Sequence, residues 1–283
     1  MSATEPRNDA QSGKVAPGGA SILQGLFGLQ GRVVYVPGGY GGIGAEIARG
    51  FARAGAKVAV SGRSLEKATS LADALRAEGH EALGLEMDAH RVPDLKDSVE
   101  RVASHFGALD LLVNCVGIQR EQRLADVTED AWDEIVQVNL KASMFLAQAA
   151  ARQQIAAVQS GRSPGAQVHL LSVRAHLGMR DRGYSAYCAT KGGLVMLIRQ
   201  HAVELSAHGI RVNGVAPTVV RGEMGRHWLA DPKTRDQVLQ RIPLGRVAEP
   251  EDVVGAALFF CSPAAAFVTG QVLFVDGGLT ATQ

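Results

Sequence analysis

The sequence predicts an α/β protein with one doubly wound domain, about seven parallel strands and helices on both faces of the sheet. Short β-branched runs alternate with helical patterns from Gly31 onward, and this order produces right-handed crossovers and a parallel sheet. The strand segments are almost continuously apolar, as expected for strands that are buried on both sides. A glycine-rich loop joins the first strand to the first helix of this alternating series.

The periodicity of the apolar residues places each element. The predicted strands are Arg32–Val36, Lys57–Ser61, Ala82–Met87, Leu109–Val113, Gln167–Leu171, Ile210–Val215 and Val272–Val275. The predicted helices are Ile43–Ala54, Leu65–Glu78, Val92–Phe106, Glu129–Gln159, Ser185–Ala207 and Pro250–Cys261, the fourth being long enough to be curved. Ligands of such sheets bind beyond the carboxyl ends of the strands, so the residues that follow each strand are expected to carry the chemistry.

The N-terminal region differs from the rest of the chain. Residues 1–28 are expected to form a flexible extension, in which Ser21–Leu29 is apolar enough for a short lead-in helix. The extension has no continuous apolar segment of the kind that a secretory signal contains. No run of about 18 apolar residues occurs anywhere, so no transmembrane helix is expected. Residues 29–283 are expected to form the single folded domain.

The composition excludes several classes of protein. Of the 283 residues 46% are apolar and 20% are charged, and the net charge of +1 provides no field for nucleic acid or an acidic membrane. The three cysteines are far apart in the sequence and the eight histidines lack metal-ligand spacing, so neither a disulfide framework nor a metal site is expected. Few unpaired cysteines favour a reducing compartment, and we expect a cytoplasmic protein.

The loop after the first strand predicts a dinucleotide site. It reads Pro37-Gly38-Gly39-Tyr40-Gly41-Gly42-Ile43-Gly44, and Gly38, Gly42 and Gly44 keep the backbone open where a pyrophosphate must approach. The helix that begins near Ile43 directs its free N–H groups and the positive end of its dipole at that anion. This placement makes the domain a Rossmann-type dinucleotide-binding and catalytic domain.

The end of the second strand favours NADP over NAD, although NAD stays open. Sites for NAD often carry an acidic residue here, whereas this chain has Gly62 followed by Arg63. A guanidinium binds a 2′-phosphate well, and the hydroxyl of Ser61 is expected to assist. Asp88 follows the third strand and is expected at the adenine amino group. Asn114 follows the fourth, where it either lies near the adenosine or caps a turn.

The ordered motifs resemble those of the short-chain dehydrogenase/reductase family. The resemblance extends from Leu29 to Thr280. It rests on the glycine loop, Asn114-Cys115-Val116-Gly117, Asn139, Ser172, Tyr187-x-x-x-Lys191, Pro217, and the segment from Gly270-Gln271 to Asp276-Gly277-Gly278. It implies hydride transfer between a nicotinamide and a carbonyl or secondary alcohol. The implied cofactor contacts are Gly38, Tyr40, Gly42, Ile43, Gly44, Ser61, Arg63, Asp88, Ala89, Asn114, Gly117, Tyr187, Lys191, Pro217, Thr218 and Val220.

Tyr187 and Lys191 are the predicted proton-transfer pair. Four residues apart on a helix, they share one face. We expect the ammonium to lower the pKa of the tyrosine toward the range that suits acid–base catalysis. Ser172 is expected to hydrogen-bond the substrate oxygen. In the family pattern, Asn139 holds a water that links the lysine to solvent.

Five differences from the family pattern involve six positions. Pro37 replaces a threonine, Cys115 and Val116 replace an asparagine and an alanine, Leu171 replaces a serine, Thr218 replaces a glycine, and Gly222 aligns with a threonine that contacts the nicotinamide carboxamide. The four catalytic positions are kept, so turnover is expected. A catalytically silent protein that only senses the cofactor is the alternative.

The predicted substrate residues are Gln119, Arg174, His176 and Tyr184. The segment Val219–Arg246, with Met224, His227, Trp228 and Leu229, is expected to act as a mobile lid. Gly117-Ile118-Gln119 and Pro243-Leu244-Gly245-Arg246 resemble the gluconate 5-dehydrogenase-like branch, which acts on sugar acids, whereas 3-oxoacyl-carrier-protein reductases share most of the motifs. Relatives form four-helix contacts, so a homotetramer or homodimer is expected.

Overall fold

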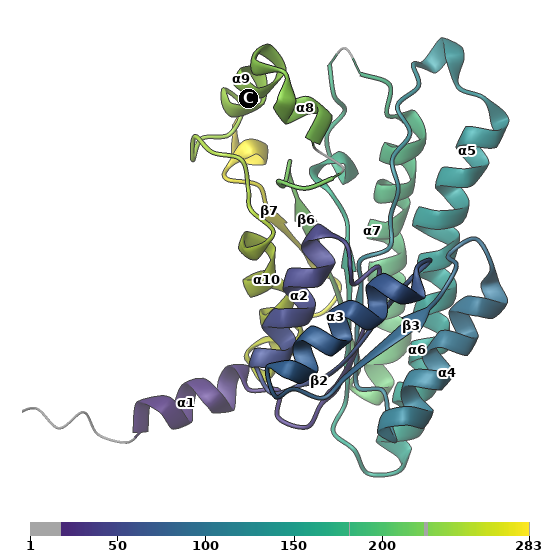
Figure 1. Ribbon diagram of the computed structural model, residues 1–283, viewed down its shortest axis with the longest axis vertical. Helices are drawn as coiled ribbons and strands as arrows, with labels where there is room; N and C mark the ends of the chain where they lie inside the picture. Colours follow the sequence, from purple (N-terminus) through teal and green to yellow (C-terminus); the bar gives the residue numbers. More distant parts are fainter. Residues whose placement is uncertain (1–17, 181, 224–225, 283) are drawn as a thin grey trace, which may run out of the picture.

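The computed structural model describes residues 18–180, 182–223 and 226–282 (Figure 1). Within them lies one seven-stranded parallel sheet in the order β3-β2-β1-β4-β5-β6-β7. The strands are β1 Val33–Pro37, β2 Lys57–Gly62, β3 Ala82–Glu86, β4 Leu111–Asn114, β5 Ala166–Leu170, β6 Arg211–Pro217 and β7 Val272–Val275. The predicted fold class is confirmed, and the strand boundaries differ from those predicted by one or two residues.

Helices cover both faces of the sheet, as the side chains of β1 illustrate by pointing alternately to one face and the other. Val34 and Val36 pack in a core with α2 (Gly42–Arg53), α3 (Leu65–Ala77) and α10 (Glu251–Cys261). Val33 and Tyr35 point to the other face, where α4 (Val92–Phe106) and α6 (Ala142–Gln159) pack. The helix α7 (Ser185–Leu205) covers β6 on the α6 side. This period of two is the reason why the strands are apolar on both faces.

The predicted long helical stretch Glu129–Gln159 is confirmed in its bounds, and it contains a π-helical turn that the sequence did not indicate. The structure has α5 at Glu129–Ile135, a π-helical turn at Val136–Lys141 and then α6. Inside the turn, the Ser143 hydroxyl donates to the carbonyl of Asn139 at 2.7 Å, which gives that acceptor a partner outside the regular helical ladder. Such π-turns occur frequently at functional sites, and this one carries a predicted catalytic residue.

The remaining elements lie at the ends of the domain. Residues 18–27 form helix α1 (Gly18–Phe27), which extends away from the body of the domain, whereas residues 1–17 of the expected flexible extension lie outside the described part (Figure 1). The lid segment contains α8 (Arg226–Ala230) and α9 (Pro232–Leu239) above β6 and β7 (Figure 1). Met224 and the side chains of His227 and Trp228 lie outside the description. Short 3₁₀ turns occur at Leu124–Asp126, Val173–Ala175, Ser206–His208, Pro263–Ala265 and Leu279–Ala281.

Among the residues described, we find no helix that combines the length and the apolar character needed to cross a membrane. The carboxyl ends of all seven strands lie on one edge of the sheet, because every neighbouring pair is parallel. The loops that follow the strands therefore meet at this edge, where the candidate site is built.

Candidate active site

The four predicted catalytic residues come together around Gly117, in the loop after β4. A β-carbon built on Gly117 would lie 3.6 Å from Asn139 Oδ1 and 3.6 Å from Lys191 Nζ, so the loop backbone approaches both groups closely. The Ser172 hydroxyl lies close enough to the phenol of Tyr187 to lower its pKa. Lys191 Nζ lies 5.6 Å from the centre of the Tyr187 ring. The sequence motifs are therefore neighbours in space.

Lys191 is held in the interior. Its side chain is buried, and Nζ donates a hydrogen bond of 2.7 Å to the carbonyl of Leu170, the last residue of β5. Burial disfavours the ammonium and lowers the pKa of Lys191 to about 8. The lysine therefore changes its charge close to neutral pH, which suits a group that relays protons.

Tyr187 behaves differently from the sequence expectation. Burial raises the pKa of its phenol to about 12, and the nearby Ser172 hydroxyl opposes this rise only in part. The expectation that Lys191 lowers the pKa of the phenol is therefore wrong for the protein without bound ligands. The reason is that loss of hydration is the largest influence on the phenol, whereas the Lys191 ammonium is directed at the Leu170 carbonyl. The phenol is accordingly protonated at neutral pH.

Asn139 clamps the loop that contains Gly117. Its Oδ1 accepts from the Ile118 N–H at 2.8 Å, and its Nδ2 donates to the Ile118 carbonyl at 2.9 Å and to Thr190 Oγ1 at 3.4 Å. Because the side chain is 1% exposed, these partners replace solvent. The π-turn thus holds the loop after β4 against the helix that carries Lys191.

The glycine loop has the geometry of a phosphate cradle. A β-carbon on Gly44 would lie 2.5 Å from the Gly38 carbonyl oxygen, and one on Gly38 would lie 2.8 Å from the Cys115 carbonyl, so neither position accepts a side chain without movement. A β-carbon on Gly42 would meet nothing within 4 Å, which leaves open space at the start of α2. The N-cap residue Gly41 offers no side chain to the first N–H groups. These groups fit the pyrophosphate of a dinucleotide.

Tyr40 occupies the place where an acidic residue often binds the ribose of NAD. A β-carbon on Gly62 would lie 2.4 Å from Cε1 of the Tyr40 ring, so the ring lies directly over Gly62. The Tyr40 hydroxyl accepts a hydrogen bond of 3.1 Å from the Ser64 N–H at the start of α3. Arg63 beside it is exposed. A longer side chain at position 62 would thus displace the tyrosine.

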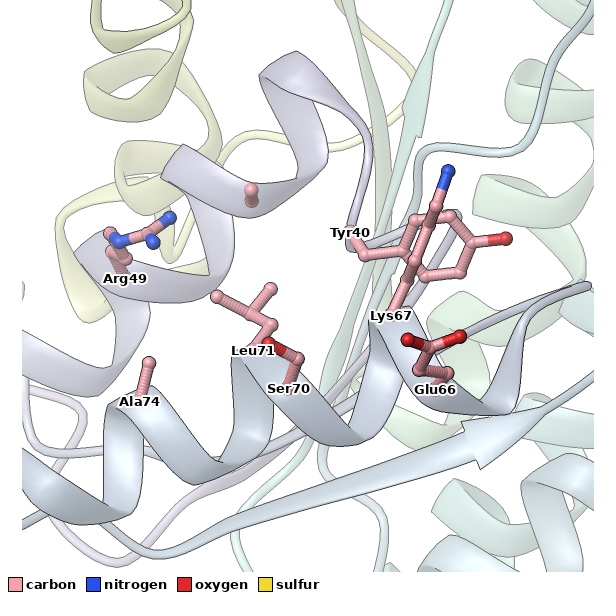
Figure 2. Close-up of a pocket in the computed structure, with 8 residues that line it drawn as sticks. Tyr40, Arg49, Glu66, Lys67, Ser70, Leu71 and Ala74 are labelled. Atoms are coloured by element: carbon pink, nitrogen blue, oxygen red, sulfur yellow. The ribbon is translucent and has the colours of Figure 1, made fainter.

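A pocket of about 340 Å³ lies between α2 and α3 beside Tyr40 (Figure 2). Lys67 projects from the first turn of α3 along the Tyr40 ring, and Arg49 lies farther along α2 (Figure 2). Both cations therefore line the same pocket as Tyr40.

Ser61 does not line this region. Its hydroxyl is fully buried and hydrogen-bonds the Tyr35 hydroxyl at 2.6 Å, between neighbouring strands. The expectation that Ser61 binds a 2′-phosphate is wrong, because the alternation along β2 turns its side chain into the core. Its carbonyl instead accepts from the N–H groups of Gly38 and Gly39 at 2.8 and 3.2 Å, and so holds the glycine loop.

The other predicted cofactor residues differ in what they contact. Asp88 Oδ1 accepts from the His90 N–H at 3.0 Å, and although burial acts to raise the pKa of Asp88, the hydrogen bonds from His90 lower it. Ala89, which follows it, is buried. Asn114 supports a turn: its Oδ1 accepts from the Val116 N–H at 3.1 Å. The turn-capping alternative for Asn114 is therefore the one observed.

Asn114 also belongs to a buried polar network that the sequence did not reveal. Its Nδ2 donates to Ser143 Oγ at 2.9 Å and lies 3.3 Å from His169 Nδ1. Burial lowers the pKa of His169 to about 3, so the ring is neutral. In the sequence, the only sign of this network is that His169 is a polar residue inside an apolar strand. That sign does not reveal that Asn114 and Ser143 belong to the network.

Pro217 and Thr218 mark the end of β6. The Thr218 N–H donates to the Val275 carbonyl at 3.2 Å. The Thr218 hydroxyl is buried and has no hydrogen-bond partner among the described residues. Thr218 therefore has a free polar atom near the place expected for the nicotinamide carboxamide. Val220 pairs with Ala248 through an isolated bridge, which holds the start of the lid segment.

The predicted substrate residues form one cluster and one outlier. Gln119 Nε2 donates to the Tyr184 hydroxyl at 2.7 Å, and the rings of Tyr184 and Tyr187 have centres 6.2 Å apart. The backbone N–H of Arg174 donates to Ser172 Oγ at 3.2 Å. His176 is exposed and stacks on Phe274 of β7, so we leave it out of the proposed pocket.

Glu121 completes this cluster and was not predicted. The Tyr184 hydroxyl donates to Glu121 Oε2 at 3.1 Å, and Arg182 lies 3.2 Å from Glu121 Oε1. Burial and the neighbouring carboxylate raise the pKa of Tyr184. An exposed glutamate in a loop carries no sequence signal of such a position.

Comparison with known proteins agrees with this geometry. A family model described as enoyl-(acyl carrier protein) reductase matches residues 38–280, most of the chain. The chain belongs to the short-chain dehydrogenase/reductase family. This confirms the resemblance that the ordered motifs indicated.

Relatives within the family act on sugar derivatives. Gluconate 5-dehydrogenase of Gluconobacter oxydans is 37% identical over 255 residues, which are 90% of this chain and 97% of the relative. The 5-keto-D-gluconate 5-reductase of Escherichia coli K12 is 32% identical, over 91% of this chain and 98% of the relative. A crystal structure of gluconate 5-dehydrogenase from Burkholderia cenocepacia in complex with NADP and tartrate has a TM-score of 0.87 and 35% identity, over 92% of this chain and 99% of that one.

Proposed function

We propose that the protein is an oxidoreductase that transfers hydride between NADP(H) and the carbonyl or secondary alcohol of a sugar acid. The observation that carries this proposal is the position of the Tyr187 ring, whose centre lies 5.6 Å from Nζ of the buried Lys191, with the Ser172 hydroxyl near its phenol. The names of the relatives, which include a gluconate dehydrogenase and a ketogluconate reductase, support the substrate class.

The nicotinamide, when bound, supplies or accepts the hydride. Ser172 holds the substrate oxygen, and Tyr187 donates a proton to it during reduction. The raised pKa of Tyr187 suits this direction, because the phenol carries its proton at neutral pH. Lys191 then returns a proton toward Tyr187, which its pKa of about 8 allows. In oxidation the phenol must first lose its proton, so the oxidation rate is expected to rise with pH.

The cofactor proposal favours NADP, with NAD as the second possibility. Position 62 is a glycine, so it offers no carboxylate to the ribose hydroxyls of NAD. The Tyr40 ring covers this position. Arg63 is exposed and carries no hydrogen bond from its guanidinium to any described residue, which leaves it available to a 2′-phosphate. The relative from Burkholderia cenocepacia was crystallised with NADP. Arg63→Ala is expected to lower the affinity for NADP more than that for NAD, and an unchanged ratio would remove this reasoning.

For the assembly we propose a homotetramer or homodimer in the cytoplasm. Met196 and Val203 on α7 are 58% and 71% exposed, and Trp132 on α5 is 40% exposed, so both helices present apolar side chains to solvent. The cysteines Cys115, Cys188 and Cys261 are free thiols, as in a reducing compartment. Light scattering coupled to size-exclusion chromatography tests the assembly, and a monomer at micromolar concentration would contradict it.

A substrate screen tests the function. The protein is mixed with NADPH and 5-keto-D-gluconate, a neutral ketose or a 3-oxoacyl thioester, and the nicotinamide absorbance is followed. We expect turnover of the keto acid and its loss in Tyr187→Phe with cofactor binding retained. Turnover of the thioester alone would assign the protein to the carrier-protein reductases. Cofactor binding without turnover of any substrate would favour the sensor alternative.

A further inference from the structure

A half-buried arginine lies beside the catalytic serine. The backbone N–H of Arg174 donates to Ser172 Oγ at 3.2 Å. Nη1 of the same residue donates to the carbonyls of Leu177 and Gly178 at 3.2 and 2.5 Å. These bonds hold one edge of the guanidinium in place. Nε and Nη2 form no hydrogen bond with any residue that the structure describes, so the other edge of the fork stays available.

Among the residues that the structure describes, no carboxylate forms an ion pair with Arg174. Burial lowers the pKa of the guanidinium, and the positive charge of Arg241 adds to this effect. The other groups that act on it are the side chains of Cys188, Tyr184 and Tyr187, which are neutral at pH 7. Within the described ranges, neither Arg174 nor Arg241 forms an ion pair with an acidic side chain. Two cations that repel each other, with no counter-ion among the described residues, favour binding of an anion.

Arg241 reaches this place from the lid segment. It follows α9, which lies above the carboxyl ends of β6 and β7, on the same edge of the sheet as the loop that follows β5 (Figure 1). Ile242 beside it is buried, which anchors the segment to the domain while the Arg241 side chain remains exposed. The two arginines therefore approach the site from different loops.

The cluster of Gln119, Tyr184 and Glu121 is rich in hydrogen-bond acceptors. Tyr184 uses its hydroxyl to accept from Gln119 and to donate to Glu121. The Glu121 carboxylate and the Gln119 amide oxygen remain as acceptors for hydroxyl groups. The site thus combines the two arginines with a group of hydrogen-bond acceptors around Tyr184. The Tyr187 ring lies near this second group.

We propose that Arg174 and Arg241 bind the carboxylate of the substrate, while Gln119 and Glu121 bind its hydroxyl groups. This inference rests on the proposed function, because it concerns the orientation of a sugar acid in the same site. Arg174 presents a fork that matches a carboxylate, and Arg241 adds a second positive charge that acts on the same place. A neutral polyol lacks the group that these arginines bind, so they act as determinants of acid specificity.

Three variants and two substrates test the inference. Arg174→Gln and Arg241→Gln remove one guanidinium each, and Arg180→Gln is the matched control, because Arg180 is an exposed arginine of the same loop. KM and kcat are measured with NADPH and either 5-keto-D-gluconate or the neutral ketose L-xylulose. A charge-assisted hydrogen bond contributes about 1.5–3 kcal/mol, so we expect KM for the keto acid to rise roughly 10- to 100-fold in the two test variants. KM for L-xylulose and both constants of the control are expected to stay unchanged.

Two results would overturn the inference. An equal loss with acid and neutral substrate would show that Arg174 only supports the loop through Leu177 and Gly178. An unchanged KM for the keto acid would show that neither arginine meets its carboxylate.

A binding measurement separates this inference from the proposed function. If the wild type reduces neither substrate, the proposed function fails, and the arginine site is then judged from thermal unfolding with tartrate in the presence of NADP. We expect tartrate to raise the unfolding temperature of the wild type and of Arg180→Gln but not of Arg174→Gln. Equal stabilisation of all three proteins would overturn the carboxylate site.

Discussion

Gly62→Asp tests how the end of β2 selects the cofactor. The new β-carbon would lie 2.4 Å from Cε1 and 2.8 Å from the hydroxyl oxygen of Tyr40, so the ring must rotate away. This rotation breaks the hydrogen bond of 3.1 Å from the Ser64 N–H, which stabilises the native state by about 1 kcal/mol. Because only the end of a flexible side chain has to move, the total cost is expected to stay near 1–2 kcal/mol. The unfolding temperature should fall by roughly 2–8 °C.

The carboxylate of the aspartate acts separately from this steric effect. It stands beside Arg63, where it competes for the guanidinium and repels a 2′-phosphate. A loss of about 2–3 kcal/mol corresponds to a decrease of roughly 30- to 150-fold in the affinity for NADP. Affinity for NAD is expected to rise, because the carboxylate can accept from the ribose hydroxyls.

Gly62→Ala is the matched control, since its methyl group displaces Tyr40 without adding charge. Both variants are titrated with NADP and NAD by calorimetry, and their unfolding is followed by differential scanning fluorimetry. We expect similar losses of stability but a change in the NADP to NAD ratio only in Gly62→Asp. If both variants bind NADP equally well, position 62 does not face the 2′-phosphate and the reasoning from Tyr40 and Arg63 is refuted.

Three further predictions concern the buried polar groups. Burial lowers the pKa of Lys191 from 10.5 to about 8, so the folded state binds fewer protons than the unfolded state between these values. The free energy of unfolding therefore gains up to roughly 3 kcal/mol as pH rises through this window. Urea denaturation of Lys191→Met from pH 7 to 10 should lack this gain, and an identical pH dependence in the wild type and the variant would contradict it. Burial holds the pKa of His169 at about 3 instead of 6.5, so stability is lost as pH falls through this range; the loss should be smaller in His169→Gln, and equal acid sensitivity would exclude this cause. Asn139→Ala leaves the Ile118 N–H and carbonyl without their partners at 2.8 and 2.9 Å. This loss should lower the free energy of unfolding by about 1–3 kcal/mol and lower kcat. Gln137→Ala in the same turn is the control, and an equal effect there would contradict the role of Asn139 in holding the loop at Ile118.

Much of the fold followed from local patterns in the sequence. The alternation of strand and helix periods predicted the parallel sheet, because each period reports which side of a segment is buried. The spacing of Tyr187 and Lys191 placed them on one helical face for the same local reason. The edge position of the site followed from the parallel order of the strands.

The directions of individual side chains depended on pairings across the fold. Ser61 turns inward to Tyr35, and Asn139 turns to Ile118, because strands and loops distant in sequence supply those partners. The π-helical turn at Asn139 likewise involves the contact with Ile118, and the period of apolar residues along the helix gives no sign of it.

The sequence by itself determined the order of the motifs along the chain, the glycine loop and the four predicted catalytic side chains, since these depend on residue type and spacing. Only the tertiary structure decided that the pKa of Tyr187 is raised and that of Lys191 is lowered. It also decided that Tyr40 covers Gly62 and that the charge of Arg241 acts on Arg174. The physical reason is that burial and electrostatic interaction depend on distances through space, which are fixed when segments remote in the chain pack together.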